Sequence, residues 1–164
     1  MIGKLEENLQ HLLDCEPCGR DNGRRKAPLT YGVYLFSEQT GVGVEHVYVG
    51  RVGLTERARR SGTGYSNLRT RLQAHTRSSS SHNQATFAFR LAVEALADSI
   101  ADLPTTRAAR GTHPPFAKVF STQKARVNAM EFRWVEILDN FECYLFEPYA
   151  AFRLNTRYNS WATS

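Results

Sequence analysis

Two short runs of β-branched and aromatic residues decide the fold of this chain: Gly32-Val33-Tyr34-Leu35-Phe36 and His46-Val47-Tyr48-Val49-Gly50. Runs of this kind, separated by a connection that contains glycine, are typical of the two strands of a β-hairpin. The connection is centred on Gly41-Val42-Gly43. Side chains alternate between the two faces of a strand, so Tyr34 and Tyr48 point away from the face that takes their valine and leucine neighbours.

A short helical pattern follows the hairpin in the stretch Asn67-Leu68-Arg69-Thr70-Arg71-Leu72-Gln73-Ala74-His75. Ser66 or Asn67 would cap this helix. Arg71 and His75 are four residues apart and therefore share one face. Arg69 is turned about 160° away from Arg71, so we expect it to face solvent or DNA. Two phenols, a guanidinium and an imidazole would then converge, which suits phosphate chemistry.

Length and charge limit the class of protein. A chain of 164 residues has the length of a single domain and is long enough to bury a hydrophobic core. The net charge is +5, and most of the 21 basic residues are arginine, which favours a nucleic-acid partner. No run approaches the roughly 18 apolar residues of a membrane helix, and the N-terminus lacks the apolar core of a signal peptide. We therefore expect a cytoplasmic protein without a membrane partner.

Arginines gather around the hairpin and the helix that follows it. The stretch 55–65 reads as an exposed, Gly-containing basic loop beside the predicted site. Basic side chains in such a place can hold a phosphate strand. The arginines that we expect to contact DNA are Arg51, Arg57, Arg59, Arg60 and Arg69.

The N-terminal region consists of a predicted helix over 3–14 and a polar basic loop, so we divide the chain into 1–30 and 31–164. Cys15 and Cys18 form a CxxC pair, and His11 precedes them. The pair is either half of a zinc site or two ordinary thiols in a turn, because a second pair is missing and only Cys143 remains.

Hydrophobic periodicity predicts the other elements. We expect a structural helix over 83–100, a loop over 103–115, a short element of undecided type over 116–120, and a third strand over 127–138. Asp139-Asn140 ends that strand and offers a helix cap. The first two strands are expected over 31–37 and 45–50.

The last segment, 141–161, reads as a helix and its exit, and it contains Glu147 among apolar neighbours. A carboxylate in such a setting needs a partner, which is either a divalent cation or one of the arginines. Pro148 removes a helical hydrogen bond, so the helix is kinked there or begins near Glu147. Glu142 is the rival metal ligand, but its neighbours are less apolar.

These parts together resemble the GIY-YIG nuclease superfamily. Gly32-Val33-Tyr34 and Tyr48-Val49-Gly50 match the two triplets, each with Val in place of Ile. The family's later Arg, His, Glu and Asn are matched, in that order, by Arg71, His75, Glu147 and Asn159. The tail from Leu145 to Asn159 is especially similar to the nuclease domain of the bacterial excision-repair endonuclease. The short chain and its arginine-rich loop look most like the small type II restriction endonucleases of this superfamily.

The resemblance implies an α+β fold, with a three-stranded antiparallel sheet flanked by helices, an extra N-terminal helix and a helical insertion. It also implies metal-dependent hydrolysis of DNA. Glu147 would hold one Mg²⁺ or Mn²⁺ ion, and a hard cation of this kind needs few protein ligands. Arg71 would neutralise charge in the transition state.

The resemblance gives the remaining site residues supporting roles. Tyr34 or Tyr48 would orient or deprotonate the attacking water, which requires a phenol pKa below its usual value of about 10. His75 would hydrogen-bond a tyrosine or take the proton onward. Asn159 would orient the site.

Three readings of the function stay open. The first is a sequence-specific restriction enzyme acting on double-stranded DNA, as a homodimer on a palindromic site. The second is a repair or mobile-element nuclease of the same fold that recognises DNA structure. The third is a basic nucleic-acid-binding module without turnover.

Overall fold

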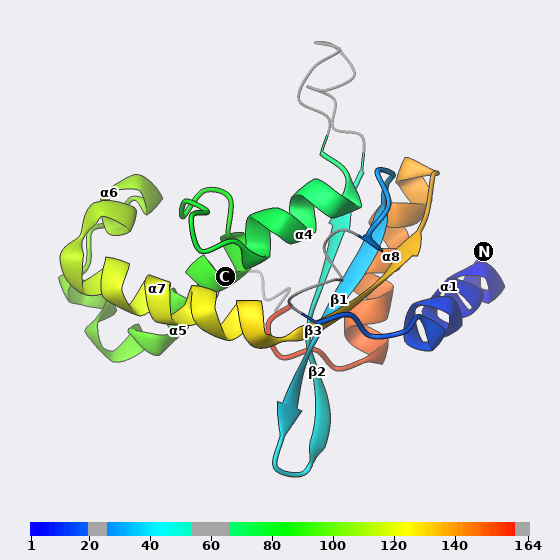
Figure 1. Cartoon of the computed structure of the whole chain (residues 1–164), viewed down its shortest axis with the longest axis horizontal. Helices are drawn as coiled ribbons and strands as arrows, with labels where there is room; N and C mark the ends of the chain where they lie inside the picture. Colours follow the sequence, from blue (N-terminus) through cyan, green and yellow to red (C-terminus); the bar gives the residue numbers. More distant parts are fainter. Residues whose placement is uncertain (20–25, 54–65, 160–164) are drawn as a thin grey trace. The chain divides into compact units, whose positions relative to one another are not determined.

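The computed structural model describes residues 1–19, 26–53 and 66–159 (Figure 1). The chain forms two compact units. The first comprises Met1–Arg71 and Met130–Ser164, and the second comprises Leu72–Ala129. Across the described residues, none of the helices combines the length and the apolar character that a membrane span requires.

The first unit is built on a three-stranded antiparallel sheet in the order β2-β1-β3 (Figure 1). The strands are β1 (Gly32–Thr40), β2 (Gly43–Val52) and β3 (Glu131–Glu136). The predicted hairpin and antiparallel sheet are confirmed. The expected third strand over 127–138 was too long, because Val127 is buried in the last turns of the preceding helix.

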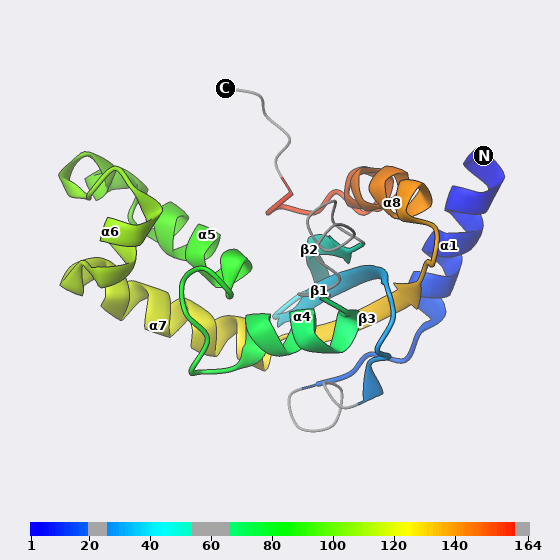
Figure 2. The same ribbon diagram turned by 90° about the horizontal axis from the view of Figure 1, so that it is seen from above.

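One face of the sheet carries the apolar core of the first unit. Helices α1 (Ile2–Asp14) and α8 (Asn140–Arg153) pack on it, as Figure 2 shows. The first helix lies where the sequence predicts it. Burial of large apolar side chains stabilises the unit by about 1.5–3 kcal/mol for each one that is fully buried. The core includes Leu5, Leu9, Leu12, Val33, Leu35, Val49, Val135, Cys143, Phe146 and Ala150.

The opposite face of the sheet is aromatic. The ring centroids of Tyr34 and Phe36 are 5.9 Å apart, and those of Phe36 and Phe132 are 5.8 Å apart. Tyr34 and Tyr48 lie 6.3 Å apart across β1 and β2. These separations are those of favourable aromatic pairs. The predicted alternation is therefore confirmed, and it places both tyrosines on the face away from α1 and α8.

Helix α8 begins at Asn140 and continues through Pro148 to Arg153. The Asp139 side chain caps it by accepting a hydrogen bond of 2.7 Å from the backbone N–H of Glu142, which confirms the predicted cap. The expectation that the helix begins near Glu147 is wrong. Cys143 and Phe146, which precede the proline, are buried in the core, and their packing outweighs the one hydrogen bond that proline removes.

The N-terminal segment completes the outer edge of the sheet. The backbone N–H of Cys18 donates to the Phe132 carbonyl, and the Phe132 N–H donates back to Cys18, both at 2.9 Å. Arg133 reaches the same segment, because its Nε donates to the Cys15 carbonyl at 3.0 Å. Cys15, Cys18 and Cys143 are free thiols. The CxxC segment therefore covers the open edge of β3 through its backbone.

The second unit is helical and differs from the sequence prediction in three places. The expected helix over 83–100 is shorter, because α5 spans Thr86–Ala95 and a 3-10 helix, η1, follows over Ala97–Asp102. The expected loop over 103–115 contains α6 (Arg107–Thr112). The undecided stretch 116–120 belongs to α7 (Pro114–Ala129). The connecting helix α4 (Leu68–Thr76) begins in the first unit and ends in the second.

Aromatic packing explains these differences in the second unit. Phe89 of α5 and Phe116 of α7 have ring centroids 4.9 Å apart, and Phe120 stacks one turn beyond Phe116. Thr106 caps α6 by accepting a hydrogen bond from the backbone N–H of Ala109. Pro114 occupies the first position of α7, where a missing N–H has no consequence. The threonine and proline that suggest a loop are therefore helix-start signals.

Glycine is required at position 32 by the close approach of β3. A Cβ atom at Gly32 would lie 2.0 Å from the carbonyl oxygen of Val135. We predict that Gly32→Ala lowers the free energy of unfolding by at least about 2 kcal/mol, because backbone atoms would have to move. Gly41→Ala is the matched control, since a Cβ there meets nothing within 4 Å. Urea denaturation of both variants measures the difference, and equal stability would contradict the prediction.

A β-bulge between β1 and β2 brings a serine and a histidine together. The register shifts between Phe36 and Ser37, so that Ser37 lies opposite His46. The Ser37 hydroxyl and His46 Nδ1 share a hydrogen bond of 2.9 Å. Burial, and secondly the charge of Arg133, lower the pKa of His46 below its usual value of 6.5. Protonation of His46 is therefore less favourable in the folded chain than in the unfolded chain.

This shift predicts a pH dependence of stability. Above pH 6.5 the His46 imidazole is neutral in the folded and the unfolded chain, so its protonation does not reduce the free energy of unfolding. As the pH falls below 6.5, the unfolded chain takes up the proton first, and the folded state loses stability until the folded pKa is passed. We expect His46→Gln to have a smaller loss of stability between pH 7 and pH 5 than the wild type in urea denaturation. Identical pH profiles would refute this expectation.

Candidate active site

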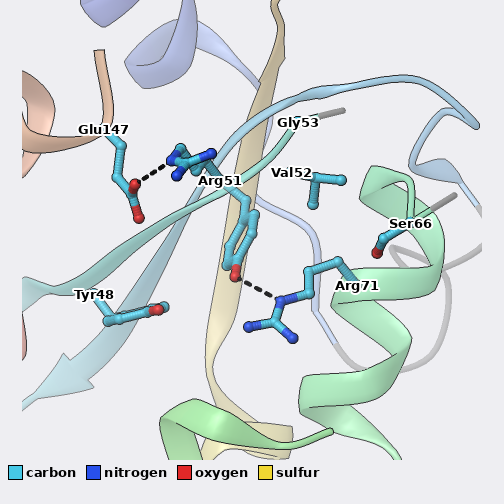
Figure 3. A pocket seen from close by; sticks show the side chains of 8 residues that line it. Tyr48, Arg51, Val52, Gly53, Ser66, Arg71 and Glu147 are labelled. Atoms are coloured by element: carbon cyan, nitrogen blue, oxygen red, sulfur yellow. Dashed lines mark hydrogen bonds and ion pairs between the residues drawn. The ribbon is translucent and has the colours of Figure 1, made fainter. Parts of the chain in front are cut away.

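A pocket of about 310 Å³ opens in the first unit beside the aromatic face (Figure 3). Strands β1 and β2 contribute its floor, the start of α4 contributes one wall, and α8 contributes the other. The pocket thus joins segments that are distant in sequence. Its lining residues are Tyr34, Tyr48, Arg51, Val52, Gly53, Ser66, Arg71 and Glu147.

The position of the Tyr34 phenol depends on Gly50. The two residues lie opposite each other in the β1–β2 register. A Cβ atom at position 50 would come within 2.4 Å of the Tyr34 hydroxyl oxygen and of the ring carbon that bears it. The ring therefore lies directly over the glycine backbone. A side chain at position 50 would therefore displace the Tyr34 phenol.

Arg71 reaches the Tyr34 phenol from α4. Its Nε donates a hydrogen bond of 3.4 Å to the Tyr34 hydroxyl oxygen, as the dashed line in Figure 3 shows. The start of the helix is held in two ways. Asn67 accepts a hydrogen bond from the backbone N–H of Thr70 at 2.9 Å, which confirms the predicted cap, and the Leu68 N–H donates to the Thr30 carbonyl at 2.9 Å. Arg71 is thereby fixed relative to β1.

Glu147 extends from α8 into the pocket and forms an ion pair with Arg51 of β2. Arg51 Nε lies 2.8 Å from Glu147 Oε2, and both side chains are mostly buried (Figure 3). The Arg51 guanidinium carbon also lies 3.4 Å from the ring centroid of Tyr144, one turn before Glu147. Of the two partners that the sequence left open for Glu147, an arginine is therefore present. The sequence indicated Arg51 only as a DNA contact.

Burial controls the protonation of the pocket. It raises the pKa of Tyr34, and the charge of Arg71 opposes this shift without cancelling it. Burial likewise raises the pKa of Tyr48, and that of Glu147 against the opposing charge of Arg51. Both phenols are therefore protonated at neutral pH. Among the described residues, the charge of Arg71 does not by itself produce the lowered phenol pKa that a tyrosine base requires.

The remaining expected site residues lie as follows. His75 belongs to the second unit, and its side chain is fully buried. Arg69 is half-buried, and its Nε donates to the Ala27 carbonyl at 2.8 Å, so part of its guanidinium is engaged by the chain itself. The expected DNA contacts Arg57, Arg59 and Arg60 lie outside the described residues.

The rival carboxylate Glu142 is not among the residues that line the pocket. Its Oε2 lies 2.6 Å from Lys4 Nζ, and its Oε1 accepts a hydrogen bond of 2.6 Å from the Asn8 amide. These contacts tie the first turn of α8 to α1. Glu142 therefore has a structural role between two helices, and Glu147 is the carboxylate that faces the pocket.

Asn159 binds the outer edge of β2 next to Tyr48. Its Oδ1 accepts the Val49 N–H at 2.6 Å, and its Nδ2 donates to the Val49 carbonyl at 2.7 Å. The Thr156 hydroxyl donates to the same Oδ1 at 2.9 Å, and the Tyr158 N–H donates to the Val47 carbonyl at 3.0 Å. Asn159 thus replaces a neighbouring strand at the residue between Tyr48 and Gly50. Thr156 was missed in the sequence, because its role follows from the contact of Asn159 with Val49, 110 positions earlier, which no local pattern indicates.

Comparison with protein-family models, curated proteins and solved structures finds no match to this chain. The chemistry of the pocket must therefore be judged from its own groups. Two guanidinium groups and two phenols surround a single carboxylate among its described lining residues. Arginines of such a set are able to bind an oxyanion. Glu147 adds an oxygen ligand of the type that Mg²⁺ or Mn²⁺ prefers, and one carboxylate with water and a phosphate suffices for such an ion.

The contacts of Asn159 generate a prediction about the backbone of β2. We expect Asn159→Ala to accelerate amide hydrogen exchange at Val49 by about threefold to tenfold, because its N–H loses its acceptor at a sheet edge. Thr156→Ser is the control, since it keeps the hydroxyl that supports Asn159. Exchange followed by NMR measures both. An unchanged rate at Val49 in Asn159→Ala would show that Asn159 does not hold this strand.

Proposed function

We propose that this chain is a divalent-metal-dependent endonuclease that hydrolyses DNA phosphodiester bonds. One observation carries the proposal. Tyr34, Tyr48, Arg71 and Glu147, which match four positions of the GIY-YIG nucleases in their order along the sequence, line a single pocket. They come from four different elements, β1, β2, α4 and α8. Ordinary strand packing of two tyrosines does not require an arginine and a buried glutamate beside them.

The residues of the pocket would divide the reaction among them. Glu147 would hold the cation, which supplies Lewis-acid stabilisation of the departing 3′ oxygen when it is bound. Arg71 would bind a non-bridging phosphate oxygen and neutralise charge that develops there. Because Tyr34 and Tyr48 are protonated at neutral pH, we assign them the orientation of the attacking water by hydrogen bonds.

We further propose that the substrate is double-stranded DNA cut at a specific sequence. The net charge of +5 and the excess of arginine support a phosphate-rich partner. A homodimer on a palindromic site is the simplest way to bring a copy of this pocket to each of the two strands. Recognition of DNA structure instead of sequence is the competing outcome, and the cleavage products distinguish the two.

Cleavage of plasmid DNA with Mg²⁺ or Mn²⁺ tests the proposal. We expect Glu147→Gln and Arg71→Ala each to reduce the rate by at least about 100-fold, because each removes a group that contacts the reacting phosphate or the cation. Glu142→Gln is the matched control. It neutralises a carboxylate in the same helix that contacts Lys4 and Asn8 instead of the pocket, so it should keep its activity after thermal unfolding has shown that it is folded.

The products and the negative outcomes are equally informative. Unique fragment ends on end-sequencing support a restriction enzyme, whereas nicks confined to branched DNA support a structure-specific nuclease. Full activity in either Glu147→Gln or Arg71→Ala would refute the assigned site. Tight DNA binding by the wild type without cleavage in either metal would show a binding module instead of an enzyme.

A further inference from the structure

The ion pair between Arg51 and Glu147 in the pocket conflicts with the role that we propose for Glu147. Glu147 must offer its carboxylate to a divalent cation, yet Arg51 already occupies Oε2 of that carboxylate at 2.8 Å. We infer that Arg51 is an internal counter-ion of Glu147, and that a divalent cation binds at this site by displacing its guanidinium. This inference rests on the proposed function, because it concerns the cation that the nuclease would use.

Because the pair is mostly buried, Arg51 competes effectively with a divalent cation for Glu147. Only 24% of the Arg51 side chain and 17% of the Glu147 side chain are exposed. Burying a carboxylate at this depth without a cationic partner is costly, and Arg51 supplies such a partner from β2. One negative charge cannot neutralise both a guanidinium and a divalent ion. The two cations would repel each other more strongly here than in water, because burial weakens screening.

Tyr144 already contacts the Arg51 guanidinium and can retain it after it leaves Glu147. The Arg51 guanidinium carbon lies 3.4 Å from the Tyr144 ring centroid, and stacking of this kind leaves the N–H groups free to turn. Arg51 can therefore leave Glu147 without becoming fully solvated. Because both Arg51 and Arg71 line the pocket, the freed guanidinium would meet the same phosphodiester anion as Arg71.

Competition has a measurable consequence for cation affinity. Only the fraction of molecules in which Glu147 is free can bind the ion, so the apparent dissociation constant is raised by the inverse of that fraction. A partly buried pair of this kind corresponds to about a fivefold effect. We therefore expect Arg51→Gln to bind Mn²⁺ about fivefold more tightly than the wild type. The electron paramagnetic resonance signal of free Mn²⁺ measures this without any turnover.

Three further variants distinguish displacement of Arg51 from a general effect of positive charge on Mn²⁺ affinity. Arg51→Lys keeps a competing cation and should stay close to the wild type. Arg71→Gln removes a charge from the same pocket but contacts Tyr34 instead of Glu147, so its gain in affinity should be clearly smaller. Arg153→Gln breaks an exposed arginine–glutamate pair with Glu6 elsewhere in the same unit, and it should not change Mn²⁺ affinity.

A second measurement follows Arg51 itself. In ¹H–¹⁵N spectra the Nε–H signal of Arg51, assigned by its absence in Arg51→Gln, should shift when Mg²⁺ is added to the wild type and remain unchanged in Glu147→Gln. An unmoved signal at saturating Mg²⁺, or equal affinity gains in Arg51→Gln and Arg71→Gln, would overturn the displacement while the metal site stands. Equal Mn²⁺ binding by wild type and Glu147→Gln would overturn both the displacement and the metal centre of the proposed function.

Discussion

The approach of the Tyr34 ring to the backbone of Gly50 is the contact on which the rest of the site depends. It requires β1 and β2 to pair in one register, since a shift of β2 by one residue would place a side chain under the ring and turn Tyr48 to the face opposite Tyr34. Arg71 donates to this phenol from the start of α4, which Asn67 caps, and Asn159 binds the outer edge of β2. The missing Cβ atom of Gly50 therefore sets the position of the Tyr34 phenol to which Arg71 donates.

Helix α8 links the core of the first unit to the pocket. Phe146 and Ala150 are buried against the sheet, whereas Glu147 and Tyr144 lie on the flank that meets Arg51. The Asp139 cap and the contacts of Glu142 with α1 hold the first turn of this helix. Pro148 follows Glu147 directly and is accommodated inside the helix. The carboxylate is therefore placed by the same packing that stabilises the fold.

Local signals in the sequence were sufficient for the parts that depend on local physics. The alternation of Val33, Tyr34 and Leu35 predicted the two faces of the sheet, and Asn67 and Asp139 were recognised as helix caps. Val127 was assigned to a strand because the residues after it alternate, whereas it is buried and belongs to α7. The pairing of Arg51 with Glu147 could not be predicted, because nothing local distinguishes one arginine among many as the partner of a distant carboxylate.

The hydrogen bonds of Asn159 have a consequence for the order in which the molecule is made. A ribosome releases the hairpin and Arg71 long before it reaches α8 and the segment that borders β2. Until residue 159 has emerged, β2 lacks the amide that satisfies Val49, and the pocket lacks its carboxylate. A nascent or prematurely ended chain therefore carries the tyrosines and arginines of the pocket without Glu147. Synthesis itself delays assembly of the complete site until the last of its parts has been translated.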